Sequence, residues 1–135
     1  TLHTLFPYTT LFRSFAGHLE TYIKKAEIMS LAEVKDDIAI AICPPDINDN
    51  ILVAQAADEL LNITGVQASF VIAKINDSVF ISARSFGDIN VQVILETLGG
   101  GGHMTMAGTK LQNISIEDAK EKLQNAIYEY LGEGE

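Results

Sequence analysis

The seven residues 37–43, DIAIAIC, place the strongest constraint on what this chain can fold into. Three isoleucines point to one side of an extended strand and two alanines point to the other, so both faces of the strand are apolar. Such a strand is typical of the interior of a sheet that is covered on both sides. The small alanine face allows a helix to approach closely, and Pro44-Pro45 ends the strand.

Strand and helix patterns alternate along the rest of the chain. Two strands, 66–75 and 78–85, are predicted to form a tight hairpin because Asn76-Asp77 lies between them. Shorter strands are expected around residues 28–34 and at 108–112, the second of these at an edge of the sheet. Apolar residues at helical spacing predict four helices, over residues 15–26, 52–62, 91–98 and 116–131.

Capping residues and glycines mark the ends of these helices. Asn48 or Asp49 can cap the second helix, and Ser115 with Asp118 matches a capping box at the start of the last. Four consecutive glycines, residues 99–102, end the third helix. The sum predicts a single α/β domain with a mixed sheet of about five strands and three to four packing helices.

Composition narrows the classes of function. The 135 residues are 47% hydrophobic, which is enough for a core without disulfides or metals. A net charge of −9 argues against a long polyanion as the main partner, but it leaves room for a small phosphorylated ligand held by one or two local cations. The single cysteine, Cys43, is predicted to be an apolar filler and indicates a reduced, cytosolic setting. Histidine and cysteine spacing predicts no metal site built from this chain alone.

Residues 1–14, TLHTLFPYTTLFRS, fit neither a helical stripe nor a strand alternation, and Pro7 interrupts them. The stretch resembles a translated sequencing-adapter fragment, and the alternative is a native but irregular tail. It is therefore interpreted as a non-native leader outside the folded domain. The natural protein is expected to continue upstream of it.

A candidate binding site gathers around GGGGH, residues 99–103. Consecutive glycines permit positive φ and leave space for a ligand, and their amides can converge on an anion. His103 can donate a hydrogen bond to a phosphate oxygen, and Arg84, at the end of a strand, can grip a phosphate bidentately. Asn90 opens the helix that leads to the glycines. On spacing alone, the alternative of a helix stop followed by slack stays open.

The segment SARSFGDINVQVILETLGGGGHMTMAG, residues 82–108, resembles the DHH-associated domain (type 1) of the DHH phosphodiesterase family. Its S-x-R-S, I-N-V and four-glycine-histidine motifs are most similar to those of cyclic-di-AMP phosphodiesterases. The resemblance covers roughly residues 15–133. It divides the chain into a leader (1–14), a linker helix from an upstream DHH lobe (15–30), and a DHH-associated substrate-binding domain (31–135).

The resemblance implies the substrate-binding lobe of a manganese-dependent phosphodiesterase that hydrolyses cyclic-di-AMP to a linear dinucleotide. The upstream DHH lobe, which this sequence does not contain, is expected to hold two Mn²⁺ ions, so this fragment alone is expected to be inactive. Arg84 and His103 are expected to grip phosphate, and Asn90 to position the nucleotide or the loop. The substrate-binding residues that match the family motifs are Arg84, Ser85, Asn90, Gly100, Gly101, Gly102 and His103. The family's paired alanines after the histidine are here Ala107 and Gly108.

Other functions remain open at this point. One is the lobe of a short-oligonucleotide exonuclease of the nanoRNase or RecJ type. Others are a non-catalytic nucleic-acid-binding module, as in alanyl-tRNA synthetases, and a plain α/β interaction domain. Expected partners are a cyclic dinucleotide or short oligonucleotide, the upstream DHH lobe, and a second copy in a homodimer of the parent. The domain is expected in the bacterial cytoplasm, in a parent that upstream helices anchor to a membrane.

Overall fold

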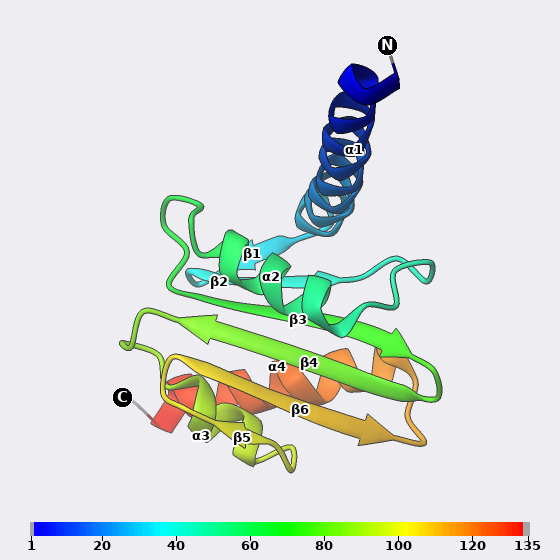
Figure 1. Cartoon of the computed structure of the whole chain (residues 1–135). Helices are drawn as coiled ribbons and strands as arrows, with labels where there is room; N and C mark the ends of the chain where they lie inside the picture. The colour runs from blue at the N-terminus through cyan, green and yellow to red at the C-terminus, as the bar shows by residue number, and fades with distance from the viewer. Residues whose placement is uncertain (1, 134–135) are drawn as a thin grey trace.

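The computed structural model describes residues 2–133, and the side chains of residues 16–132; residues 134–135 of the predicted domain lie outside the described part. Its strands are β1 (Glu33–Lys35), β2 (Ile38–Ile42), β3 (Ala68–Ile75), β4 (Ser78–Ser85), β5 (Gly101–Gly102) and β6 (Met106–Gln112). Its helices are α1 (Leu2–Ser30), α2 (Asn50–Leu60), α3 (Val91–Glu96) and α4 (Ile116–Glu133). The strands form one sheet in the order β1-β2-β3-β4-β6-β5 (Figure 1). Only β2 and β3 run parallel among neighbouring pairs.

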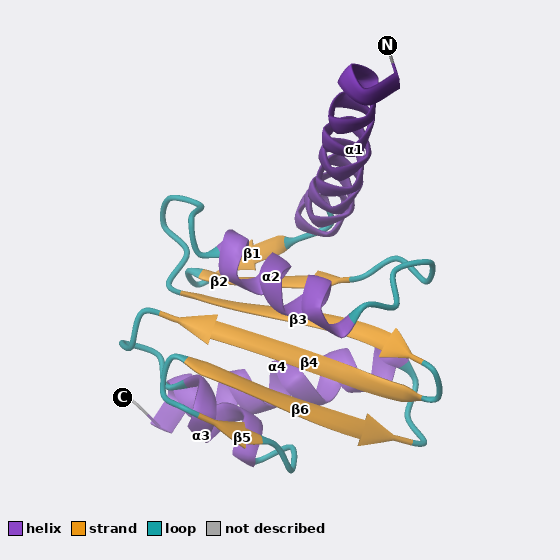
Figure 2. Ribbon diagram, viewed as in Figure 1, coloured by secondary structure: helices purple, strands orange, loops and turns teal. Residues whose placement is uncertain are grey.

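Helices cover both faces of this sheet, as the two apolar faces of β2 predict. Ile38 belongs to a core that α3 and α4 complete on one face. Ala39 and Ala41 belong to a second core, which α2 completes on the other face. Figure 2 shows α2 in front of β2 and β3, with α4 behind the sheet. The α/β class and the mixed sheet are therefore confirmed.

The turn and cap signals of the sequence are also found in the structure. Ile75 pairs with Ser78, so Asn76-Asp77 forms the two-residue turn between β3 and β4. The Asp49 carboxylate accepts from the amide of Ile51 at 2.9 Å, so Asp49 rather than Asn48 caps α2. Ser115 Oγ accepts from the Asp118 amide at 3.1 Å at the start of α4.

Three larger differences separate the structure from the sequence prediction. Helix α1 begins at Leu2, so the backbone of residues 2–14 is helical although its pattern predicts no element. The same helix runs on to Ser30, so the strand predicted at 28–34 shrinks to β1. An additional strand, β5, pairs with Ala107 and Gly108. Strand β6, which is predicted as an edge strand, is therefore not a free edge along its whole length. Two glycines have no side-chain alternation, which is why the sequence pattern does not reveal β5.

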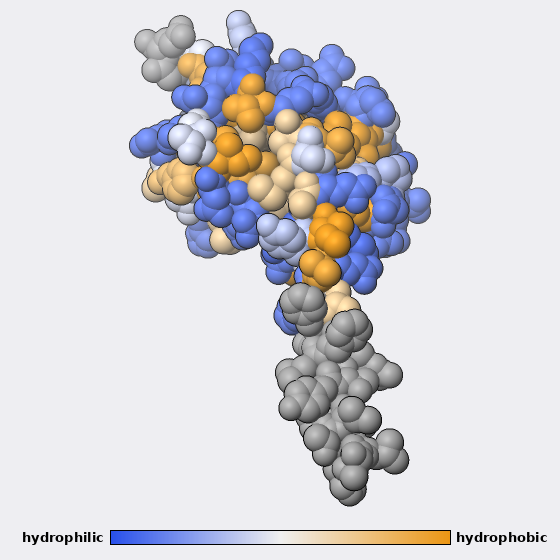
Figure 3. All heavy atoms as spheres, turned by 90° about the horizontal axis from the view of Figure 1, so that it is seen from above, coloured by the Kyte–Doolittle hydropathy of each residue, from blue (hydrophilic) through white to orange (hydrophobic). Residues whose placement is uncertain are grey.

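The opposite edge of the sheet is β1, all three residues of which are exposed. Val34 is exposed between Glu33 and Lys35. Figure 3 looks down on the molecule from the α1 side and shows apolar patches separated by hydrophilic side chains. A short edge strand that carries charges disfavours pairing with the edge of another sheet.

Among the described helices, none has both the length and the apolar character that crossing a bilayer requires.

Candidate functional site

Arg84 lies near the end of β4, on the face of the sheet that α2 covers in part. Its Nε donates to Asp58 Oδ1 of α2 at 2.7 Å, and its Nη1 donates to the Ala83 carbonyl at 2.8 Å. The Arg84 side chain is 11% exposed, whereas that of Asp58 is 57% exposed. A guanidinium has five N–H donors, so these two contacts leave further donors for a ligand. The sequence identifies Arg84 but not Asp58, which lies 26 residues away.

A buried serine explains why α2 places Asp58 beside Arg84. Ser69 of β3 is the strand partner of Arg84, and its Oγ donates to the Ala57 carbonyl of α2 at 2.6 Å. Ser69 is fully buried, so this hydrogen bond fixes the last turns of α2 against the sheet. Asp58 follows Ala57 directly, and its carboxylate therefore reaches the guanidinium.

The glycine quartet forms hydrogen-bonded structure rather than slack: its first two residues end α3 and its last two form a strand. Gly99 has φ +85°, and its amide donates to the Glu96 carbonyl, while the Gly100 amide donates to that of Leu95. This pair of hydrogen bonds is the Schellman pattern, in which a glycine with positive φ ends a helix. Gly101 and Gly102 then form β5.

Close packing against β6 requires two of these glycines. A Cβ on Gly100 would lie 2.4 Å from the Gly108 carbonyl oxygen. A Cβ on Gly102 would lie 2.5 Å from the Met106 carbonyl oxygen, and Gly102 has φ +146°. Glycine therefore lets β5 lie directly against β6. The predicted convergence of glycine amides on an anion is not seen for Gly99 and Gly100, because both amides bind protein carbonyls.

His103 follows β5 and, with Met106, flanks the two-residue turn of the β5–β6 hairpin (residues 101–112). Its amide donates to the Met106 carbonyl at 2.6 Å, and the Met106 amide donates back to the His103 carbonyl at 3.3 Å. Met106 in turn is the strand partner of Arg84. Directly paired residues project from the same face of a sheet, so Arg84, Met106 and His103 form one row. Two strand spacings separate the backbones of Arg84 and His103 by about 10 Å.

Ser85 and Asn90 support this row from the other face. Ser85 is buried, and its Oγ donates to the Met104 carbonyl at 3.2 Å. The amide of Val91 donates to the same carbonyl at 3.1 Å. Asn90 uses its side-chain oxygen to cap α3 by accepting from the Val93 amide at 3.2 Å. Of the two roles predicted for Asn90, this geometry favours positioning of the loop.

An open groove of about 500 Å³ runs from Arg84 along β4, between α2 and the exposed strand β6. Its residues on the α2 side include Gln55 and Asp58, and its floor includes Phe80, Ser82 and Gly108. No sequence motif singles out Phe80. The alternation of β4 contains the signal, because Phe80, Ser82 and Arg84 occupy every second position and share a face.

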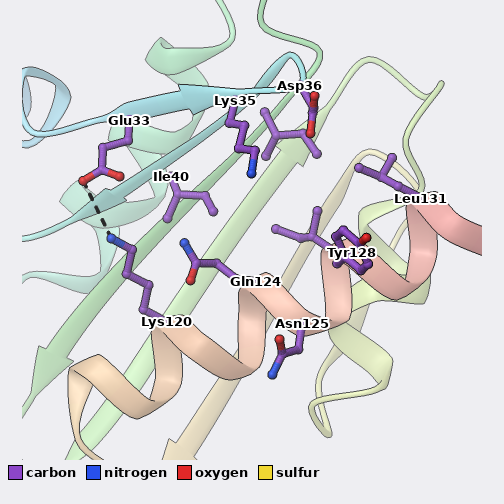
Figure 4. Close-up of a pocket in the computed structure, with 11 residues that line it drawn as sticks. Glu33, Lys35, Asp36, Ile40, Lys120, Gln124, Asn125, Tyr128 and Leu131 are labelled. Carbon is purple, nitrogen blue, oxygen red and sulfur yellow. Dashed lines mark ion pairs between the residues drawn. The ribbon is translucent and has the colours of Figure 1, made fainter.

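A second cavity, of about 340 Å³, lies between the β1–β2 edge and α4 (Figure 4). Ile38 and Ile40 of β2 line it, and a Lys120–Glu33 ion pair of 3.7 Å closes one side. It contains no residue that the sequence selects as a site residue. Arg84 and Met106 of the row line the groove on the α2 face, and His103 lies beside Met106 at the end of the row.

The remaining reactive groups do not form a second centre. Within the described part of the chain, no three His, Cys, Asp or Glu side chains are arranged to hold a metal ion. Cys43 is buried, and burial raises the pKa of its thiol to about 12. The thiol is therefore protonated near neutral pH, in keeping with an apolar filler.

Residues 35–133 match the DHHA1 domain family, and the chain belongs to this family. It is 47% identical over 117 residues to cyclic-di-AMP phosphodiesterase GdpP of Geobacillus thermodenitrificans. It is 46% identical over 121 residues to cyclic-di-AMP phosphodiesterase GdpP of Bacillus subtilis. These alignments cover 84% and 86% of this chain, but the chain spans only 18% of each relative.

Solved structures share the fold at low sequence identity. An exopolyphosphatase-related protein from Bacteroides fragilis superposes with a TM-score of 0.73 at 19% identity, over 82% of this chain and 34% of that one. The C-Ala domain of alanyl-tRNA synthetase from Aquifex aeolicus gives a TM-score of 0.56 at 15% identity, over 70% of this chain and 96% of that one. At these identities the comparison concerns the fold alone.

Proposed function

We propose that this chain is the substrate-binding lobe of a phosphodiesterase that acts on cyclic-di-AMP. The observation that carries the proposal is the row of Arg84, Met106 and His103 beside an open groove. The names of the GdpP relatives support the choice of substrate.

In this proposal the groove binds and orients the phosphodiester. Arg84 neutralises a phosphate oxygen through N–H donors that Asp58 leaves available, and Asp58 keeps the guanidinium from turning away. His103 donates to a second oxygen from the turn between β5 and β6. Fixing the substrate in one orientation contributes to the rate because the reacting atoms no longer have to find each other by diffusion.

The two manganese ions that the family resemblance implies do not fit the described residues of this chain, which hold no suitable ligand cluster. We therefore assign these ions, and the Lewis-acid chemistry that they supply, to an upstream DHH lobe. The proposed contribution of this chain is recognition of the substrate.

The test compares hydrolysis of cyclic-di-AMP by the two-lobed parent enzyme and by its Arg84→Ala and His103→Ala variants. Lys122→Ala, which removes an exposed cation from α4, is the matched control. We expect kcat/KM to fall by at least about tenfold in the first two variants, because each loses a charge-assisted hydrogen bond to phosphate. Full activity in both variants would remove Arg84 and His103 from the site. The 135-residue chain alone should bind the dinucleotide without hydrolysing it.

The open groove also supports a second candidate, a lobe that handles short linear oligonucleotides. The chain is 35% identical over 69 residues to the bifunctional oligoribonuclease and PAP phosphatase NrnA of Thermus thermophilus, over 51% of this chain and 21% of that one. To separate the two candidates, kcat/KM is measured for linear oligonucleotides of increasing length and compared with kcat/KM for cyclic-di-AMP. A kcat/KM that rises from two to five nucleotides and exceeds that for cyclic-di-AMP favours the second.

A further inference from the structure

One face of strands β4 and β6 is covered only in part. Helix α2 packs in front of β2 and β3, and Figure 2 shows β4 and β6 open on this side. Three cross-strand pairs project from the open face: Arg84 with Met106, Ser82 with Gly108, and Phe80 with Lys110. A flat polar face with one aromatic ring and two cations is unusual in a chain of net charge −9.

Phe80 and Lys110 form the far end of this face. Phe80 is half-buried on the groove floor, and the Nζ of Lys110 lies 5.6 Å from the centre of its ring. Of the described residues that line the groove, Phe80 is the aromatic one. Four residues of extended strand separate it from Arg84, which is about 13 Å.

The position between these two ends carries no side chain. Gly108 lies beside Ser82, and a Cβ there would make only ordinary contact, 3.4 Å from the Ile81 carbonyl oxygen. The fold therefore does not demand glycine at this position as it does at Gly102. A bare backbone next to a half-exposed ring leaves room for a planar group to lie against the sheet.

We propose that Phe80, Lys110 and Gly108 form a nucleobase platform, which holds one base of a dinucleotide that Arg84 grips by a phosphate. An aromatic ring stacks on any base, and in this proposal the flexible Lys110 side chain, whose Nζ lies over the Phe80 ring in the free chain, swings aside to admit the base and attracts the next phosphate. This inference rests on the proposed function, since Arg84 supplies the phosphate contact. It adds the substrate feature that the platform recognises, which is the base itself.

The experiment titrates the ¹⁵N-labelled 135-residue chain with two ligands, followed by NMR. The linear dinucleotide pApA carries bases, and ribose 5-phosphate carries phosphate without a base. Phe80→Leu removes the ring but keeps apolar bulk, Phe80→Tyr restores a ring, and Lys122→Met is the control. We expect Phe80→Leu to weaken pApA binding by roughly fivefold or more, with ribose 5-phosphate unchanged and Phe80→Tyr close to wild type.

Unchanged pApA binding in Phe80→Leu overturns the platform, and so does an equal loss of both ligands, which indicates a general structural effect. Arg84→Ala reports separately on the proposed function, because it should weaken both ligands. If Arg84→Ala loses both ligands while Phe80→Leu loses neither, the phosphate site stands and the platform does not. Failure of the wild-type chain to bind either ligand overturns both proposals.

Discussion

The glycine quartet offers a sharp test of how the β5–β6 hairpin is built, because neighbouring glycines make different demands. Adding one methyl group at Gly102 places a Cβ 2.5 Å from the Met106 carbonyl oxygen and 2.6 Å from the Ala107 Cα. Both atoms belong to the backbone of β6, so neither can turn aside. Adding the same group at Gly101 meets no atom within 4 Å, and Gly101 does not have positive φ.

The magnitudes follow from these contacts. Forcing extra volume into a packed site costs about 1–3 kcal/mol, and positive φ costs an alanine roughly 1–2 kcal/mol more. Gly102→Ala should therefore lower the free energy of unfolding by roughly 2–5 kcal/mol, a large part of the roughly 5–15 kcal/mol typical of a domain. Gly101→Ala should change it by less than about 0.5 kcal/mol.

Urea denaturation of both variants, followed by circular dichroism, measures the difference. For a domain of this size each kcal/mol corresponds to a change in Tm of roughly 3–4 °C, so thermal unfolding provides an independent check. Equal destabilisation by Gly101→Ala and Gly102→Ala would refute the reasoning, because only close approach and backbone conformation distinguish the two sites. So would a fully stable Gly102→Ala.

Three further predictions concern Asp58 and Cys43. Asp58→Asn should lower the free energy of unfolding by less than about 1 kcal/mol, since the carboxylate is 57% exposed and solvent screens its pair with Arg84; a loss of 3 kcal/mol in urea denaturation would contradict this. Because the thiol pKa of Cys43 is about 12, only about one thiol in ten thousand ionises in the folded chain at pH 8, and DTNB should react with it only on unfolding. The raised pKa also means that the unfolded chain loses this proton above pH 9.0 while the folded chain keeps it. The free energy of unfolding should therefore fall as the pH rises from 9.0 toward 12. If DTNB labels Cys43 as fast in the native chain as in the unfolded chain, the burial of Cys43 is contradicted.

Much of the fold was predictable because local patterns and tertiary structure agree in this chain. The two apolar faces of β2, the Asn76-Asp77 turn and the apolar stripe of α4 each have a period that belongs to one kind of element. Strand β5 was not predictable, since two glycines have no such period. The helical backbone of residues 2–14 was not predictable either, because the stretch contains Pro7 and lacks a regular stripe.

The candidate site was likewise predictable only in part. The motif that contains Arg84, Ser85, Asn90 and residues 100–103 was recognisable in the sequence, whereas the roles of its members depend on which face of the sheet each one occupies. Strand alternation and the hairpin register place Arg84 and His103 beside the groove. The same alternation turns Ser85 toward the opposite face, where it braces the hairpin.

The sequence by itself therefore determined most of the elements and their caps, and it indicated candidate residues for binding phosphate, since these depend on periodicity and on the chemistry of single side chains. Tertiary structure alone decided that α2 leaves β4 and β6 open, that Asp58 meets Arg84 across 26 residues, and that Phe80 shares their groove. Contacts between distant segments depend on strand order and packing. Strand order and packing produce no periodic pattern in the local sequence around the residues that they bring together.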